Sequence, residues 1–181
     1  MDKAFNGMLF ERHSIRKYKA QPLPAEDVKQ ILEAGLLAPS SKSARPWEFV
    51  CVEDADMLAK LAECKPAGAR PIAGAKLAII ICADPEKSDV YVEDCSVAAS
   101  YMQLQATALG IGSCWIQVRN RFSADDNPAQ DLVQALLGIP ASMQVVAILT
   151  FGYSDEQRNP VDPAKLKWEK VHIGQWADDQ Q

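Results

Sequence analysis

Residues 76–82 place the strongest constraint on the fold, because one lysine is followed there by the apolar residues Leu-Ala-Ile-Ile-Ile-Cys. A strand with one face in water alternates apolar and polar side chains. A run that is apolar throughout is instead typical of a strand buried on both faces. The run therefore predicts the central strand of a sheet.

Helices and further strands follow on either side of this run. Pro24 suits the first turn of a helix, and apolar residues then recur at helical spacing until Pro39 stops it. Asp54 or Asp56 can cap a further short helix. A long helix rich in small residues is predicted over 88–109, where close packing within one subunit and packing between two subunits both remain open. The other predicted elements are a helix over 125–137 and strands over 48–52, 113–116 and 145–153.

The last segment, residues 154–181, is polar, contains two prolines and has too little apolar periodicity to fold alone. A tail of this kind either frays or lies across another surface. Its large apolar side chains would allow it to dock, and these are Trp168, Val171, Ile173 and Trp176. A chain of 181 residues is long enough for one domain and short for two, so residues 1–181 are expected to form a single domain.

Composition excludes several classes of protein. The net charge of −5 argues against nucleic acid as a partner, because binding a phosphate backbone requires an excess of Lys and Arg. No long apolar run predicts a membrane span, and the N-terminus lacks the features of a signal peptide, so we expect a cytoplasmic protein. The 5 cysteines form no Cys-x-x-Cys pair and are expected to be buried apolar residues in a reducing compartment. With 2 histidines and no ligand at metal spacing, no metal site is expected.

Two short segments are the candidates for function. Residues 12–16 read Arg-His-Ser-Ile-Arg, a basic cluster suited to a phosphate, and residues 39–47 read Pro-Ser-Ser-Lys-Ser-Ala-Arg-Pro-Trp. The second is a hydroxyl-rich turn between a helix and a strand, which suits a ribityl chain and a flat ring. Together they supply what flavin mononucleotide (FMN) needs, although each alone is also explained by a solvated surface.

Other chemistries lack their motifs. Gly110 and Gly112 follow a helix instead of a strand, so they are not a dinucleotide fingerprint, and no P-loop or Gly-x-Ser-x-Gly elbow is present. Glu93 and Asp94 are adjacent, point in different directions and are expected to form a solvated first turn of a helix. The lack of an acid–base or nucleophilic apparatus is typical of a protein whose cofactor carries the chemistry.

Seven segments, in order along nearly the whole chain, resemble the signatures of one family. They are residues 12–18 (RHSIRKY), 31–41 (ILEAGLLAPSS), 46–50 (PWEFV), 108–115 (ALGIGSCW), 136–140 (LLGIP), 152–153 (GY) and 165–172 (KLKWEKVH). Each motif is loose alone, but the ordered set is specific. The chain resembles the nitroreductase family of FMN-dependent NAD(P)H oxidoreductases, in its short single-domain form.

The resemblance implies an α+β, three-layer fold in which a central mixed, mostly antiparallel sheet lies between helices. It also implies an intertwined homodimer with two FMN sites at the subunit interface. The helix rich in small residues would pack at that interface, and residues 154–181 would dock on the partner subunit.

The implied activity is the reduction of nitroaromatics, quinones or similar flat small-molecule acceptors, with NAD(P)H as co-substrate and a ping-pong hydride mechanism. No side chain is expected to be catalytic. The alternative is a flavin-binding reservoir or redox sensor without significant reductase turnover. The same fold also hosts reductive dehalogenation and flavin breakdown, in relatives that usually carry extra segments.

The resemblance also implies a set of cofactor-binding residues. Arg12 and Arg16 would bind the phosphate and the ribityl region, with hydrogen bonds from His13 and Ser14. The remaining positions are Pro39, Ser40, Ser41 and Ser43, contributed by the other subunit, then Trp115, Ile116 and Gln117 along the ring, and Lys165 near the phosphate. Arg70 lies where some members contact the edge of the ring.

Four positions depart from the family pattern. Ser43 and Arg45 replace the usual Asn and Gln, and the shorter side chain at 43 removes a ring contact. Gln117 and Val118 stand where a glycine is common, which predicts a narrow space over the flavin and a preference for small flat acceptors.

Overall fold

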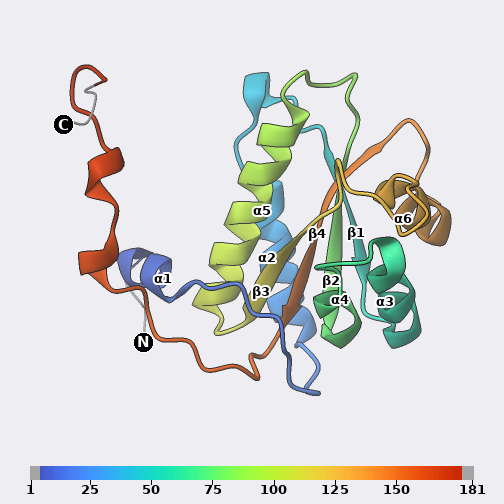
Figure 1. Cartoon of the computed structure of the whole chain (residues 1–181), viewed down its shortest axis with the longest axis horizontal. Helices are drawn as coiled ribbons and strands as arrows, with labels where there is room; N and C mark the ends of the chain where they lie inside the picture. Colours follow the sequence, from blue (N-terminus) through green and yellow to red (C-terminus); the bar gives the residue numbers. More distant parts are fainter. Residues whose placement is uncertain (1–4, 177–181) are drawn as a thin grey trace.

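The computed structural model describes residues 5–176 and has three layers, with a sheet between two groups of helices (Figure 1). The strands are β1 (Trp47–Val52), β2 (Leu77–Ala83), β3 (Gly112–Gln117) and β4 (Gln144–Gly152). The helices are α1 (Phe5–Glu11), α2 (Ala25–Leu36), α3 (Ala55–Leu61), α4 (Pro71–Gly74), α5 (Tyr91–Ala108) and α6 (Ala129–Leu137). Short 3-10 turns are η1 (Ser41–Ser43), η2 (Ala62–Cys64), η3 (Pro163–Lys165) and η4 (Trp168–Lys170).

The sheet has the order β1-β2-β4-β3, and each neighbouring pair of strands is antiparallel. Ser14 adds an isolated parallel bridge to Ser113 at the outer edge of β3. The expected mixed, mostly antiparallel sheet is therefore confirmed. The apolar run predicted to be central is β2, and every one of its residues is buried.

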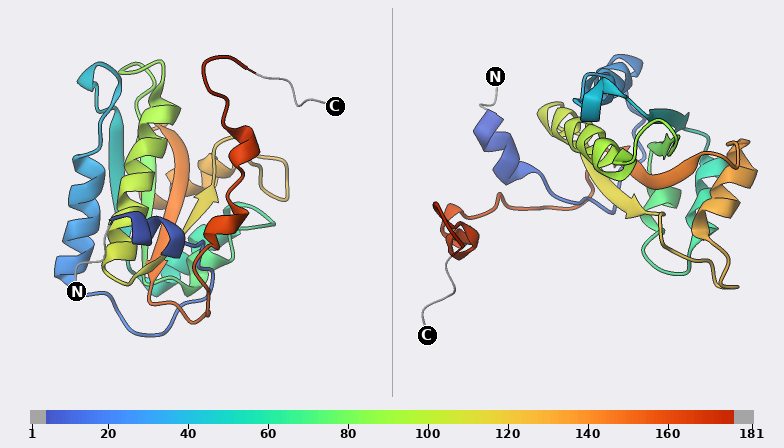
Figure 2. Two further views of the ribbon diagram at one scale, coloured as in Figure 1. Left: turned by 90° about the vertical axis from the view of Figure 1, so that its left-hand side faces the viewer. Right: turned by 90° about the horizontal axis from the view of Figure 1, so that it is seen from above.

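The side chains of β2 point alternately to the two faces of the sheet, which explains why helices cover both faces. Leu77, Ile79 and Ile81 pack with residues of α2 and α5 in one core, while Ala78 and Ile80 pack with residues of α3 and α6 in the other. Successive side chains of a strand point to opposite faces, so an apolar residue at every position requires cover on both sides. Figure 2 shows this arrangement from above, with α2 and α5 on one side of the sheet and α3 and α6 on the other.

Helix boundaries differ from the sequence expectations at two places. The helix expected from 125 begins at Ala129, because Asp126 has a φ of 61° in a turn closed by a hydrogen bond from Ser123 N–H to the Asn127 carbonyl. The helix expected from 88 begins at Tyr91, because the Ser88 hydroxyl folds back to accept a hydrogen bond from the Val90 N–H. The cap expected at Asp54 is present, and its side chain accepts from Met57 N–H at 2.8 Å.

The segment after β4 leaves the body of the molecule and runs past α1 (Figure 2). The Val161 N–H donates to the Phe10 carbonyl at 2.8 Å, and beyond this point the chain continues through η3 and η4. Its apolar anchors do not dock on their own chain, since Trp168, Ile173 and Trp176 are 69%, 94% and 79% exposed. Among residues 5–176, no helix combines the length and the apolar character that a membrane span requires.

Candidate functional site

Residues 12–18 lie across the β3–β4 edge of the sheet, and two glycines make this position possible. Gly112 and Gly152 pair across the two strands. A Cβ at Gly112 would lie 2.9 Å from Ile15, and one at Gly152 would lie 2.8 Å from the Tyr18 ring. A larger residue at either position would therefore have to displace the side chain of Ile15 or Tyr18.

Hydrogen bonds then fix the segment. Ile15 N–H donates to the Ser113 carbonyl at 2.9 Å, and the Tyr18 hydroxyl lies 2.6 Å from the Ile15 carbonyl and 2.8 Å from Thr150 Oγ1. Burial raises the pKa of Tyr18, so its hydroxyl remains protonated and available as a donor. The basic segment is thus held in one backbone conformation.

Replacing Gly152 with alanine tests this positioning. We expect Gly152→Ala to lower the free energy of unfolding by about 1–3 kcal/mol, because the new methyl group overlaps the partly buried ring of Tyr18. The expected readouts are a lower thermal unfolding midpoint and less flavin in the purified protein. Gly74→Ala is the matched control, since no atom lies within 4 Å of a Cβ built there. Equal flavin content in the two variants would contradict the positioning role.

Three cations from two separate segments line one cavity. Arg16, Lys17 and Arg70 surround a space of 590 Å³ together with Glu156. Glu156 is already engaged, because Arg158 donates two hydrogen bonds to its carboxylate at 2.8 and 3.1 Å. These bonds hold the pKa of Glu156 below its usual value, so it stays ionised beside its own partner. The cavity therefore keeps an excess of positive charge, which favours an anion such as a phosphate.

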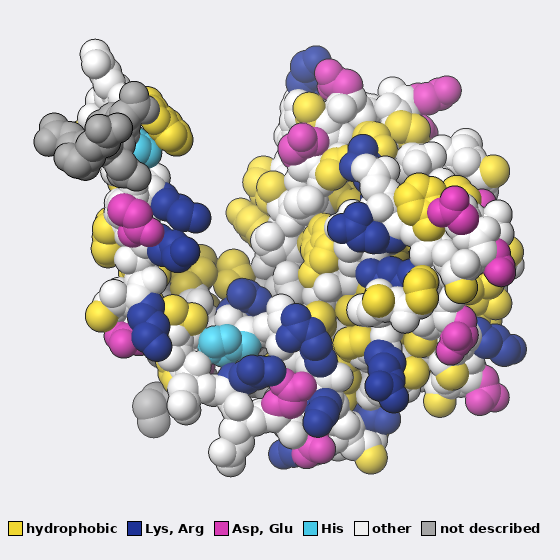
Figure 3. All heavy atoms as spheres, in the orientation of Figure 1, with side chains coloured by type: hydrophobic (Ala, Val, Ile, Leu, Met, Phe, Trp, Pro, Cys, Tyr) yellow, Lys and Arg dark blue, Asp and Glu magenta, His cyan; other side chains and the backbone are white. Residues whose placement is uncertain are grey.

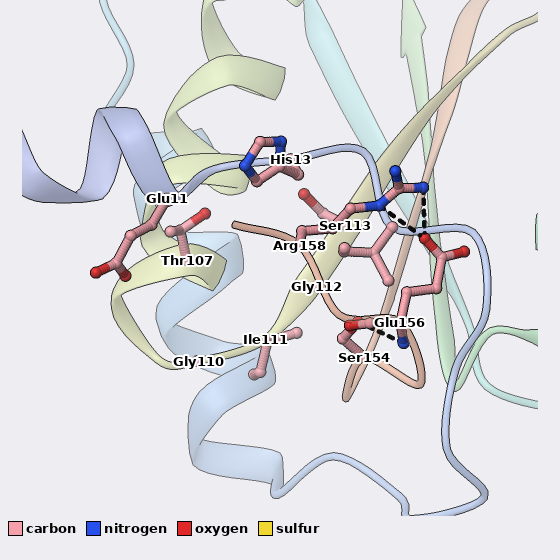
Figure 4. A pocket seen from close by; sticks show the side chains of 11 residues that line it. Glu11, His13, Thr107, Gly110, Ile111, Gly112, Ser113, Ser154, Glu156 and Arg158 are labelled. Atoms are coloured by element: carbon pink, nitrogen blue, oxygen red, sulfur yellow. Dashed lines mark hydrogen bonds and ion pairs between the residues drawn. The ribbon is translucent and has the colours of Figure 1, made fainter. Parts of the chain in front are cut away.

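His13 lies in a neighbouring cavity of 190 Å³, which Glu11, Ser113 and Arg158 also line (Figure 4). Its Nε2 atom is buried and has no hydrogen-bond partner within the described part of the chain. A buried polar nitrogen without a partner costs free energy that a ligand or a second chain would recover. His13 and Arg16 thus line two cavities that share Glu156, whereas Arg12 and Ser14 line neither of them.

The turn at 39–45 is a second, separate group. Ser41 N–H donates to Asp94 Oδ1 at 2.7 Å, Ser88 Oγ lies 2.9 Å from Asp94 Oδ2, and Arg45 N–H donates to Ser40 Oγ at 2.9 Å. The residues with positive φ are Lys42 (51°), Ser43 (54°) and Arg45 (44°). Non-glycine residues in this region are strained, and such strain is concentrated at functional sites. Pro39 and Ser43 are exposed, so the turn presents a rigid surface to the outside.

Asp94 corrects one sequence expectation. It is 5% exposed and anchors the turn, whereas adjacent Glu93 and Asp94 were expected to be solvated. The overlooked signal is its spacing, because Asp94 lies four and eight residues before the buried Ala98 and Met102 on the same helical face.

The end of β3 forms the third group. Trp115 Nε1 donates to Gln117 Oε1 at 2.9 Å, and Gln117 Nε2 donates to the Arg119 carbonyl at 2.8 Å. Lys65 Nζ donates to the Gln117 carbonyl at 2.7 Å, and burial lowers the pKa of this lysine. Lys65 was not predicted from the sequence. Ile116 is 2% exposed and packs in the core on the α3 and α6 side.

Val118 is the second correction. It is 1% exposed and packs in the same core as Ile116. Its side chain is therefore part of the interior, and the expectation that it narrows an open space over a ring is wrong.

Within one chain, the turn at 39–45 lies far from the basic segment at 12–18. The turn is anchored to Asp94 in the first turn of α5, whereas Ser14 pairs with Ser113, which follows the last turn of that helix. An α-helix of 18 residues is about 27 Å long at 1.5 Å per residue. Lys165 lies apart from both, exposed in η3.

Comparison with known proteins gives a consistent family. The model of the Nitroreductase family matches residues 9–70 and 66–153. An archaeal protein from Archaeoglobus fulgidus, with the provisional name NADH dehydrogenase/NAD(P)H nitroreductase, is 34% identical over 174 residues, which cover 93% of this chain and 97% of that protein.

Two solved structures extend the comparison. An FMN-dependent nitroreductase from Clostridium difficile is 46% identical, with a TM-score of 0.92 and coverage of 94% of this chain and 99% of that one. A provisionally named nitroreductase from Desulfovibrio desulfuricans, in complex with FMN, is 25% identical with a TM-score of 0.69, and 88% and 94% of the two chains are covered.

Proposed function

Because the chain belongs to the nitroreductase family, we propose that it is an FMN-dependent oxidoreductase that uses NAD(P)H to reduce flat acceptors such as nitroaromatics and quinones. The observation that carries the proposal is the positively charged cavity lined by Arg16, Lys17 and Arg70, which lies at the edge of the sheet where residues 12–18 run. NAD(P)H is a cytoplasmic reductant, so the proposal also locates the enzyme in the cytoplasm.

The residues present suit FMN. A phosphate needs cations without carboxylate partners, and within residues 5–176 the guanidinium groups of Arg12, Arg16 and Arg70 form no ion pair. The unpartnered Nε2 atom of His13 suits a ligand hydroxyl or phosphate oxygen. Bidentate pairing of guanidinium with phosphate would make Arg12 and Arg16 the main contributors to cofactor affinity.

The chain's own residues would hold and shape the site. FMN, when bound, would supply the two-electron chemistry between NAD(P)H and the acceptor. The backbone of Trp115, Ile116 and Gln117 would lie along the ring, and Lys65 would keep that backbone in place through its bond to the Gln117 carbonyl. NAD(P)H and the electron acceptor would occupy the same open face of the flavin in turn, so no separate nicotinamide-binding domain is needed.

A second copy of the chain would complete the site. The rigid turn with Ser40, Ser41 and Ser43 lies about one helix length from its own basic segment, so it would cover the site of the partner. A groove of 300 Å³ between α1 and α5, lined by Phe5, Met8, Tyr101 and Leu104 among others, is apolar and open. Figure 3 shows hydrophobic side chains on the body where it faces the tail, with space between the two. The partner subunit would fill that space, and the apolar anchors of the tail would dock on it. Lys165 would then approach the FMN phosphate of one of the two sites.

Initial-rate kinetics tests the proposed activity. With NADPH or NADH varied at several fixed concentrations of a quinone, we expect parallel double-reciprocal lines, because the two substrates use one slot in turn. Intersecting lines would contradict the shared slot. Bound flavin that is not turned over with any acceptor would support a flavin reservoir or redox sensor instead.

A further inference from the structure

A cavity of 270 Å³ lies where β3 ends, separate from the cavities around Arg16 and His13. The residues that line it come from the loop after β3, from the first residue of α5, from α6 and from the start of β4. Its polar side chains are Arg119, Asn120, Arg121, Gln130, Gln144 and Tyr91. Among residues 5–176, no aspartate or glutamate lines it, although the whole chain carries a net charge of −5.

Within the residues that the structure describes, both arginines of this cavity lack a carboxylate partner. Arg119 and Arg121 form no ion pair in the part of the chain that is described, and Arg121 Nη1 donates only to the adjacent Asn120 carbonyl at 2.8 Å. Asp125 and Asp126 are close in sequence, but they are exposed and do not line the cavity. Two uncompensated guanidinium groups on one concave surface attract an anion.

The backbone around the cavity is fixed before any ligand binds. Arg119 N–H donates to the Val146 carbonyl at 3.1 Å, Arg121 N–H to the Val118 carbonyl at 3.0 Å, and Ala129 N–H to the Arg121 carbonyl at 2.8 Å. Asn120 adopts a φ of 56°, which turns the chain sharply between the two arginines. A loop that is ordered in advance loses little entropy when it binds a ligand.

The cavity begins directly after β3, the strand that would lie along the flavin. Gln117 bonds through its side-chain amide to the Arg119 carbonyl, so the first arginine of the cavity is tied to the last residue of β3. Phe122 is 51% exposed at the rim and offers an aromatic surface beside the charges. An anionic group bound here would belong to a molecule whose flat ring extends towards β3.

From this arrangement we infer that Arg119 and Arg121 form a specificity subsite for an anionic group carried by a substrate of the flavin site. The inference rests on the proposed function, because it assigns the subsite to a molecule that reacts there. Two sources supply the same chemistry: the 2′-phosphate that distinguishes NADPH from NADH, and the carboxylate of an acidic acceptor.

Binding without turnover tests the subsite first. Isothermal titration calorimetry of the flavin-loaded protein with adenosine 2′,5′-bisphosphate and with AMP probes the phosphate source. We expect Arg119→Gln, Arg121→Gln to weaken one anionic probe by about ten- to a hundredfold, since hydrogen bonds to charged groups carry that much affinity. For the acceptor source, the corresponding comparison is between nitrobenzoate, which carries a carboxylate, and nitrobenzamide, which does not. The matched control is Lys29→Gln, Lys60→Gln, which removes the same charge from the exposed surfaces of α2 and α3.

Steady-state rates separate the two sources. A fall of about tenfold or more in the ratio of kcat/KM for NADPH to that for NADH identifies the donor, and the same fall in the ratio for nitrobenzoate to nitrobenzamide identifies the acceptor. If the arginines are needed for anion binding but the protein shows no turnover, the proposed function is wrong, and so is the assignment of the subsite to a substrate of the flavin site. Ratios and affinities equal to those of the lysine control would overturn the subsite while leaving the oxidoreductase intact.

Discussion

Arg12→Ala, Arg16→Ala is expected to purify as a folded protein that is largely free of FMN. Both side chains lie at the surface of a segment that the backbone holds through Ile15 and Tyr18, so their removal leaves the fold intact. Each charge-assisted contact to a phosphate contributes about 1.5–3 kcal/mol, and losing two weakens binding by two to four orders of magnitude, at about 1.4 kcal/mol per order. The measurement is the ratio of flavin to protein absorbance after purification, with circular dichroism to confirm the fold.

The matched control for this experiment is Lys29→Ala, Lys60→Ala, which removes two cations from helices remote from the segment. It should retain flavin at the level of the unmodified protein. If the double arginine variant also retains stoichiometric FMN, the phosphate is bound elsewhere and the assignment of residues 12–16 is wrong.

Truncation after Tyr153 is expected to give aggregated or unfolded protein. The truncation removes the segment whose large apolar side chains find no surface on their own chain, including Trp168, Ile173 and Trp176. If these residues cover apolar groups of α1 and α5 on a partner, their loss exposes a groove of 300 Å³ and the faces around it. Stability of such a dimer cannot be separated from its assembly.

A chain that ends after Trp176 is the control, because it keeps every apolar anchor. It should behave as a dimer in size-exclusion chromatography with light scattering, without dissociation into folded monomer on dilution. A well-behaved monomer of the shorter chain that still binds flavin would contradict the exchange of tails between subunits.

Local patterns predicted most of the fold. The apolar run at 77–82 became a central strand because every face of it is covered, and Pro39, Asp54 and Gly110 act where helices end or begin. The two helix starts that were wrong, at 88 and 125, lie in turns stabilised by Ser88 and Ser123, where side-chain and backbone bonds compete with the helix.

From composition and pattern alone, the candidate site was visible only where its residues are neighbours in the chain, and the family resemblance added Arg70 and residues 115–117. Residues 12–16 act as one segment, so their pattern was visible. Arg70 and Lys65 reach the same edge of the sheet through α4 and η2, and Asp94 supports a turn more than fifty residues earlier. Val118 was misplaced because it was assigned from a family position at which glycine is common. Alternation continued from the buried Ile116 through Gln117 places its side chain in the core.

Mixing the purified protein with NADPH or NADH under anaerobic conditions, while recording the visible spectrum, tests the central claim most directly. We expect a flavin band in the protein as purified, rapid bleaching on addition of the nicotinamide, and recovery of the band on addition of a quinone. A protein without a flavin band after reconstitution with FMN, or a band that neither nicotinamide bleaches, would contradict it.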